Sequence, residues 1–126
     1  ANAISSEQSP EEKFTTLFQN QFSFFKKHPH FVVAVFSDGL MEESERINET
    51  ILKIMQVKMK HLIPIIIEGQ QKSIFTNSIT SDELIHIVMG TFRLQMFKWR
   101  VANFQFDINR NGDNMIQAVL TLIKSK

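Results

Sequence analysis

Between Thr80 and Val101 the apolar residues follow a helical period but occupy two faces instead of one. At roughly 100° per residue, six side chains gather on one face: Ile85, Val88, Met89, Phe92, Met96 and Trp99. The roughly opposite face carries Ile87, Gly90, Leu94, Phe97 and Val101. A surface helix needs one apolar face, so the second face predicts either a central position in the fold or a partner subunit. We favour the partner subunit.

Two helices have clear start signals. Ser9 is an N-cap candidate, Pro10 suits the first helical position, and Glu12 completes a capping box. The helix that follows should end near Lys27, because Pro29 disfavours helical geometry at the residue before it. Its apolar face consists of Phe14, Leu17, Phe18, Phe22 and Phe25. Thr80-x-x-Glu83 is a second capping box, at the start of the two-faced helix.

The remaining segments also favour helices. Residues 31–36 suit a short helix or a buried strand, and no second strand is visible to pair with them, so we expect a helix. A long helical pattern covers 43–71, with a kink or a break at Pro64, and a loop at 73–78 follows. Asn109 to Gly112 predicts a turn before a last helix over 113–125. The expected fold is therefore an all-α bundle of five to six helices.

The composition and the motifs that are missing exclude several classes of protein. The 126 residues include no cysteine, carry a net charge of +1 and contain no apolar run long enough for a membrane span. Residues 107–112 imitate the start of a calcium loop, but its twelfth position is Ala118 in place of a carboxylate. No nucleophile elbow, phosphate loop or zinc motif is present. We therefore expect a cytoplasmic protein that is not an enzyme and uses no cofactor or metal.

One polar anomaly suggests a binding site. Lys58 falls at the centre of the apolar face of 43–71 and His61 at its edge, so either they reach solvent or they contact the polar end of a ligand. The twelve phenylalanines are either core or the lining of an adaptable apolar pocket. The candidate ligand-binding residues are Phe18, Phe22, Phe25, Lys58, His61, Leu62, Phe92 and Trp99.

The order of segments resembles the C-terminal part of TetR-family transcriptional regulators. The resemblance rests on the stretches 9–14, 25–31 and 62–72, and above all on 89–94 with 98–101 and 104–107. It implies that residues 9–126 form an effector-binding and dimerisation domain. Because the chain begins Ala-Asn-Ala without an initiator Met, we expect residues 1–8 to be disordered or cloning-derived. The resemblance has a further implication. It also implies a homodimer in which the last two helices of each copy form a four-helix bundle. The implied interface residues are Ile87, Gly90, Leu94, Phe97, Val101, Ile116, Val119, Leu120 and Ile123.

The chain departs from the family in having no helix-turn-helix, so it would contact DNA only through an N-terminal domain that is missing here. The resemblance implies a ligand-sensing domain of a repressor, released from DNA by a small effector. The effector itself does not follow from the family, although a Phe-rich lining without tyrosine favours a mostly apolar molecule. The alternative is a free-standing helical module that binds a partner helix.

Overall fold

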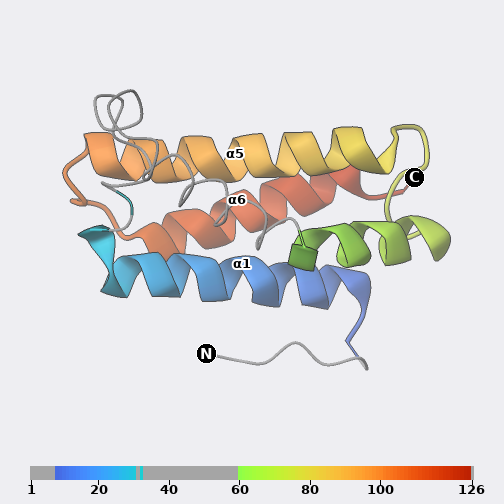
Figure 1. The fold of residues 1–126 in the computed structure, drawn as a ribbon, viewed down its shortest axis with the longest axis horizontal. Helices are drawn as coiled ribbons and strands as arrows, with labels where there is room; N and C mark the ends of the chain where they lie inside the picture. The colour runs from blue at the N-terminus through green and yellow to red at the C-terminus, as the bar shows by residue number, and fades with distance from the viewer. Residues whose placement is uncertain (1–7, 31, 33–59, 126) are drawn as a thin grey trace.

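The computed structural model describes residues 8–30, 32 and 60–125, and within this part the chain is helical (Figure 1). The labelled helices are α1 (Pro10–Lys27), α5 (Ser81–Val101) and α6 (Ile108–Ile123). A fourth helical stretch covers 60–71, and residues 29, 30 and 32 are also helical. This confirms the all-α class. The prediction of five to six helices also involved 31–59, which lies outside the described residues apart from Val32.

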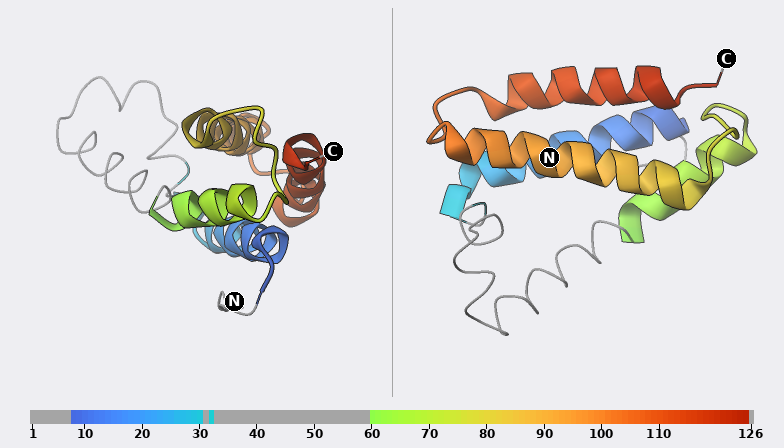
Figure 2. Two further views of the ribbon diagram at one scale, coloured as in Figure 1. Left: turned by 90° about the vertical axis from the view of Figure 1, so that its right-hand side faces the viewer. Right: turned by 90° about the horizontal axis from the view of Figure 1, so that it is seen from above.

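The four helical stretches surround one shared core. In Figure 1, α1 and α5 run in the same direction, while α6 and the 60–71 helix run the opposite way. The end-on view in Figure 2 shows the four helices arranged around a common centre. Both α1 and α5 pack against α6. The residues that fill the centre include Phe14, Phe18, Phe22, Leu62, Ile66, Phe92, Met96 and Ile116.

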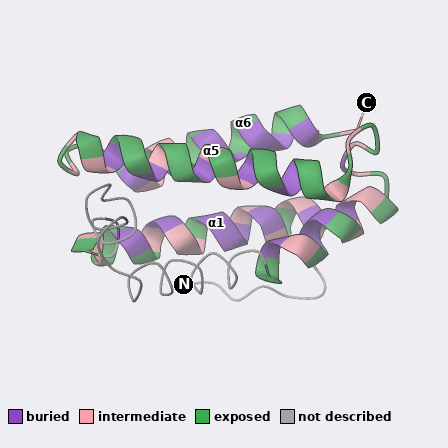
Figure 3. Cartoon of the chain, turned by 45° about the horizontal axis from the view of Figure 1, so that its top comes forward, coloured by how far each residue is buried: buried purple, intermediate pink, exposed green. Residues whose placement is uncertain are grey.

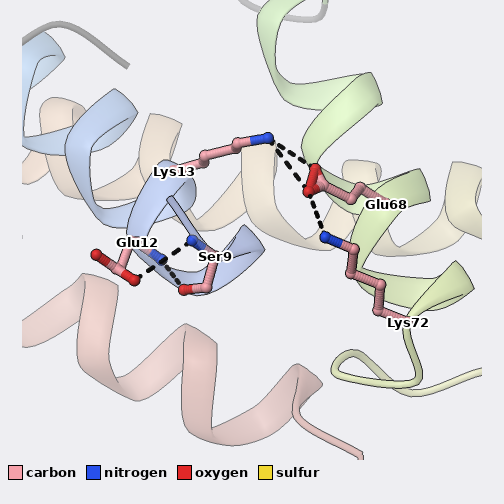
Figure 4. Close-up of polar contacts among 5 residues, drawn as sticks. All are labelled: Ser9, Glu12, Lys13, Glu68 and Lys72. Carbon is pink, nitrogen blue, oxygen red and sulfur yellow. Dashed lines mark hydrogen bonds and ion pairs between the residues drawn. The ribbon is translucent and has the colours of Figure 1, made fainter. Parts of the chain in front are cut away.

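The predicted starts of α1 and α5 are confirmed. The Ser9 hydroxyl accepts a hydrogen bond from the Glu12 N–H at 3.2 Å, and the Ser9 N–H donates to the Glu12 carboxylate at 3.3 Å (Figure 4). Thr80 caps α5 by accepting from the Glu83 N–H at 3.2 Å, which is one of the two hydrogen bonds of the capping box expected there. These contacts satisfy N–H groups that have no partner inside the first helical turn.

The predicted start of the last helix is wrong. α6 begins at Ile108, so the expected turn from Asn109 to Gly112 is helical, and α6 ends at Ile123. The cause is Asp107, whose carboxylate accepts from the Asn109 N–H at 3.1 Å and so caps the helix five residues earlier than expected. A second contact holds this cap, because Lys26 of α1 pairs with the Asp107 carboxylate at 3.3 Å.

Gly112 lies inside α6 because the packing against α1 leaves no room for a side chain. A Cβ at this position would lie 2.6 Å from Cε2 of Phe22, closer than real Cβ atoms approach other atoms. The Phe22 ring is itself buried, so it has no free space to move into. Gly112, which the sequence analysis assigned to a turn, is therefore a glycine that allows α6 to pack closely on α1.

The connection between the 60–71 helix and α5 is the expected loop, and it is tied to the end of α6. Phe75 is fully buried against Gly69, where any side chain would overlap the Phe75 ring. The Thr76 N–H donates to the Ile123 carbonyl at 2.7 Å, and the Ser125 N–H donates to the Ile74 carbonyl at 2.9 Å. These bonds hold the last residues of the chain beside the loop.

Pro64 does not interrupt the helix within its described part, which is continuous over 60–71. The rest of the predicted 43–71 pattern lies outside the described residues. An ion-pair group joins the 60–71 helix to α1: Lys13 contacts the Glu68 carboxylate at 2.8 Å, and Lys72 contacts it at 3.2 Å (Figure 4). The hydrogen bond from Lys13 and then that from Lys72 lower the pKa of Glu68 below its ordinary value of 4.5.

We expect Gly112→Ala to destabilise the fold by about 1–2 kcal/mol, because overpacking against Phe22 outweighs the better helix propensity of alanine. The measurement is the free energy of unfolding in urea. Asn114→Ala on the exposed side of α6 is the matched control and should cost nothing. A Gly112→Ala protein as stable as this control would contradict the packing argument.

We expect Glu68→Gln to lower the melting temperature at pH 7. Because the folded-state pKa of Glu68 lies below its unfolded value, its stabilising contribution is present above about pH 4.5 and is lost as the pH falls through the folded pKa. The difference between wild type and Glu68→Gln should therefore shrink under acid conditions. Lys13→Met, which removes the principal cause, should reduce the same pH dependence. A constant difference from pH 7 to pH 3 would argue against this role for Glu68.

Candidate functional site

The inner face of α5, which we define as Ile85, Val88, Phe92, Met96 and Trp99, is buried against the other helices. At its centre the Phe92 ring lies 5.2 Å from Phe22, 5.4 Å from Phe18 and 6.4 Å from Phe25, measured between ring centroids. These tilted contacts lie in the distance range at which aromatic pairs are stabilising. The aromatic face of α1 and the inner face of α5 therefore form one aromatic cluster.

Trp99 joins this cluster to the connection between α5 and α6. Its indole N–H donates to the Phe106 carbonyl at 3.0 Å, and its ring meets the Phe104 ring edge-on at 4.8 Å. Phe104 adopts the left-handed conformation, with φ of 61°, which is uncommon for a residue other than glycine. The indole N–H of Trp99 is thus used in a hydrogen bond within the chain.

The structure brings together six of the eight predicted ligand-binding residues. Phe18, Phe22, Phe25, Leu62, Phe92 and Trp99 are all buried in the same core cluster. His61, by contrast, is exposed, and Lys58 lies outside the described residues. The six buried members are therefore apolar apart from the indole N–H of Trp99, which is bonded to the Phe106 carbonyl.

The outer face of α5, which we define as Ile87, Gly90, Leu94, Phe97 and Val101, points away from the core. Its four side chains are 38–64% exposed, with Leu94 at 58%. Gly90 is also exposed, and a Cβ placed there would meet nothing within 4 Å. Figure 3 shows exposed positions repeating along α5 on the side away from its neighbours. The inner apolar face of α5 is thus buried in the core, and the outer apolar face is exposed to solvent.

The expected contribution of α6 to the interface needs correction. Ile116, Val119, Leu120 and Ile123 are buried by this chain itself, so they belong to its core and do not form an outward-facing row. The large apolar side chain that α6 does expose is Leu122, at 76%. The sequence analysis missed Leu122. The available signal was its position, because an apolar residue next to Ile123 falls outside the apolar row of the helix.

Acidic residues lie at the start of α5 and basic residues near its end. Its first turn carries Asp82 and Glu83, and its last turns carry Lys98 and Arg100. The Nε atom of Arg100 is buried and has no hydrogen-bond partner within the part of the chain that the structure describes. Of these four residues, Glu83 continues the outer face and Lys98 lies at its edge, while Asp82 and Arg100 lie about 100° from its centre.

Metal sites and membrane spans were also considered for the described residues. Residues 8–30, 32 and 60–125 contain no group of three or more His, Cys, Asp or Glu side chains that could hold a metal ion. None of the described helices is long and apolar enough to cross a membrane.

Comparison with known proteins gave a matching family model and a similar solved structure. A TetR family model described as "YsiA-like protein, C-terminal region" matches residues 1–123. No curated protein matches the chain. Among solved structures, the chain is similar to the transcriptional regulator FadR from Bacillus subtilis in complex with stearoyl-CoA, with a TM-score of 0.79 at 15% sequence identity. The likeness covers 94% of this chain and 63% of the FadR chain, so this chain spans less than two thirds of that protein's length.

Proposed function

Because this chain belongs to the TetR family as a YsiA-like C-terminal region, we propose that it is the ligand-sensing and homodimerisation domain of a TetR-like repressor. In this proposal a helix-turn-helix domain N-terminal to the present chain contacts the operator. Two copies joined through their C-terminal domains would set the distance between two recognition helices. An effector that favours a different arrangement of the copies would release the repressor from DNA.

The observation that supports dimerisation most directly is the outer face of α5. Four large apolar side chains stand exposed along one line of a helix whose inner face is already buried. Exposed apolar side chains gathered in this way mark interaction sites in soluble proteins. The same face would also suit a partner helix from another protein, and the oligomeric state of the purified chain distinguishes the two cases.

The proposed effector is mostly apolar, and a long-chain acyl-CoA is the first class to test. The rings of the aromatic cluster of α1 and α5 pack on one another in this structure, and in this proposal they would part to line the effector site. The FadR structure, whose fold this chain shares, was determined with stearoyl-CoA. A long acyl chain suits such a lining, while its polar head group would have to remain near solvent.

The arrangement of α5 offers a physical link between effector and DNA in this proposal. Its inner face contacts the aromatic rings of α1, and its outer face would contact the second copy. A ligand inserted among the rings would displace α5 and, with it, the surface that joins the copies. Such a ligand shifts the equilibrium only by the difference in its affinity for the two arrangements.

For the dimer, we expect the purified chain to sediment as a dimer and Leu94→Asp to raise the dimer dissociation constant by at least about tenfold, because a carboxylate would be buried at the contact. Analytical ultracentrifugation measures this. Phe24→Asp, which changes an exposed apolar side chain of α1, is the matched control and should leave the dimer intact. A Leu94→Asp protein that dimerises like wild type would exclude the outer face of α5 as the interface.

For the effector, we expect stearoyl-CoA, kept below its micelle concentration, to raise the melting temperature. At a hundredfold excess over its dissociation constant the stabilisation is about 2.7 kcal/mol. Coenzyme A without an acyl chain should have little effect, because the cluster recognises only the apolar part. Native mass spectrometry gives an independent readout through the added mass. The acyl-CoA proposal fails if neither measurement separates stearoyl-CoA from coenzyme A.

A further inference from the structure

We infer that the connection between α5 and α6, residues 102–107, is a strained turn with two conformations, and that Trp99 holds it in the conformation seen here. A shift of Trp99 would release the turn and loosen the start of α6. The inference rests on the proposed function only in its last step, which makes the effector the cause of that shift.

The end of α5 needs one left-handed residue, and Asn103 supplies it. The Asn103 N–H donates to the Arg100 carbonyl at 2.9 Å. The Phe104 N–H donates to the Trp99 carbonyl, also at 2.9 Å. These two bonds are typical of a helix end in which the residue after the C-cap is left-handed. Asn103 has a φ of 56°, and asparagine is one of the residues that tolerate this conformation.

Phe104 is left-handed as well, with a φ of 61°, although the helix end does not require a second such residue. In this conformation the Cβ of a residue other than glycine lies too close to a carbonyl oxygen, which costs a factor of roughly five to thirty in an equilibrium constant. Such a backbone persists only where its surroundings over-determine it. The turn therefore stores strain at Phe104.

Three contacts of Trp99 hold the strained part of the turn. Its carbonyl accepts from the Phe104 N–H, and its ring meets the Phe104 ring edge-on at 4.8 Å. Its indole N–H donates to the Phe106 carbonyl at 3.0 Å. Because the three contacts share one residue, a movement of Trp99 weakens all of them together. A turn held in this way changes between two arrangements and does not deform gradually.

Trp99 connects the turn to the interior of the bundle. Its side chain is 3% exposed and lies in the same core cluster as Phe92, which precedes it by about two helical turns on the same face of α5. A displacement of α5 at the aromatic rings would therefore also displace Trp99.

Asp107 connects the turn to α1 and α6. The turn lies at the end of the bundle where α1 also ends (Figure 1), and the Asp107 carboxylate both caps α6 and pairs with Lys26 of α1 at 3.3 Å. Asp107 follows Phe104 by three residues, so a change of φ at Phe104 would redirect it. A relaxed turn would thus weaken the cap and the ion pair, and the first turn of α6 would loosen from α1.

Alanine and glycine at position 104 test the strain, because both lack the ring but only glycine tolerates a left-handed backbone. We expect Phe104→Gly to have an unfolding equilibrium constant about three to ten times smaller than that of Phe104→Ala, measured in urea. The same two substitutions at Gln105, whose φ is not positive, are the matched control, and there alanine should be the more stable. A Phe104→Ala protein at least as stable as Phe104→Gly would overturn the strain.

Trp99→Phe tests the hold, because phenylalanine keeps a ring but has no N–H to donate. We expect hydrogen exchange at the Phe104 and Gln105 amides to accelerate by at least about tenfold relative to the Val119 amide in the middle of α6. Met96→Leu, which conserves volume on the same inner face, is the matched control and should leave this ratio unchanged. Equal ratios in the two variants would overturn the role of Trp99.

Stearoyl-CoA tests the last step. If the effector relaxes the turn, glycine at position 104 favours the unliganded state and should weaken binding about threefold to tenfold relative to alanine, measured by calorimetry. The two Gln105 variants should bind equally. Trp99 is the sole tryptophan, so its emission should also change when wild type binds stearoyl-CoA. Equal affinities of the two position-104 variants would exclude the turn from effector sensing.

These outcomes separate the inference from the proposal on which its last step rests. A wild-type chain that does not bind stearoyl-CoA refutes the acyl-CoA proposal, while the stability and exchange experiments still decide whether the turn is strained and held by Trp99. Binding that is equal in the two position-104 variants refutes the coupling and leaves the acyl-CoA proposal standing.

Discussion

The packing of Phe92 among three phenylalanines of α1 fixes how α5 is rotated about its own axis. A helix advances about 100° per residue, so burying Phe92 determines the direction of every other side chain of α5. Leu94, two residues later, must then point away from the core. A rotation that covered Leu94 would place Phe92 in water and bring polar residues of α5 toward the α1 rings. The exposed apolar face is therefore a direct consequence of the inner packing.

The parts of the fold that the sequence predicted correctly depend on local interactions. Ser9 with Glu12, and Thr80 with Glu83, are neighbours in the chain, so their capping contacts are visible as short motifs. The helical period then extends each prediction through α1 and α5. The two faces of α5 were also visible, because periodicity reports direction around a helix. Which face the chain itself covers was not, because apolar residues suit a core and an interface equally well.

The roles of Gly112 and of the apolar row of α6 were predicted wrongly because they depend on contacts distant in sequence. Gly112 reads as a turn residue, but its role is to admit the ring of Phe22, 90 positions away in the chain. The apolar row of α6 was assigned to the interface, whereas α1 and α5 pack on α6 and its apolar row is buried in the shared core. The aromatic part of the candidate ligand site was predicted because its members share faces of α1 and α5. Its expected polar end at Lys58 lies outside the described residues, so that half stays a prediction.

In the proposed regulator, α5 is one helix shared by two contacts of different kinds. The inner contact is a set of interlocked rings, which resists small displacements because a protein interior is close-packed. The outer contact would be made by a single line of exposed apolar side chains. Coupling between distant sites is typically about 1–3 kcal/mol. A ligand among the rings would contribute to such coupling only by displacing α5, because that displacement would also move the exposed line that includes Leu94.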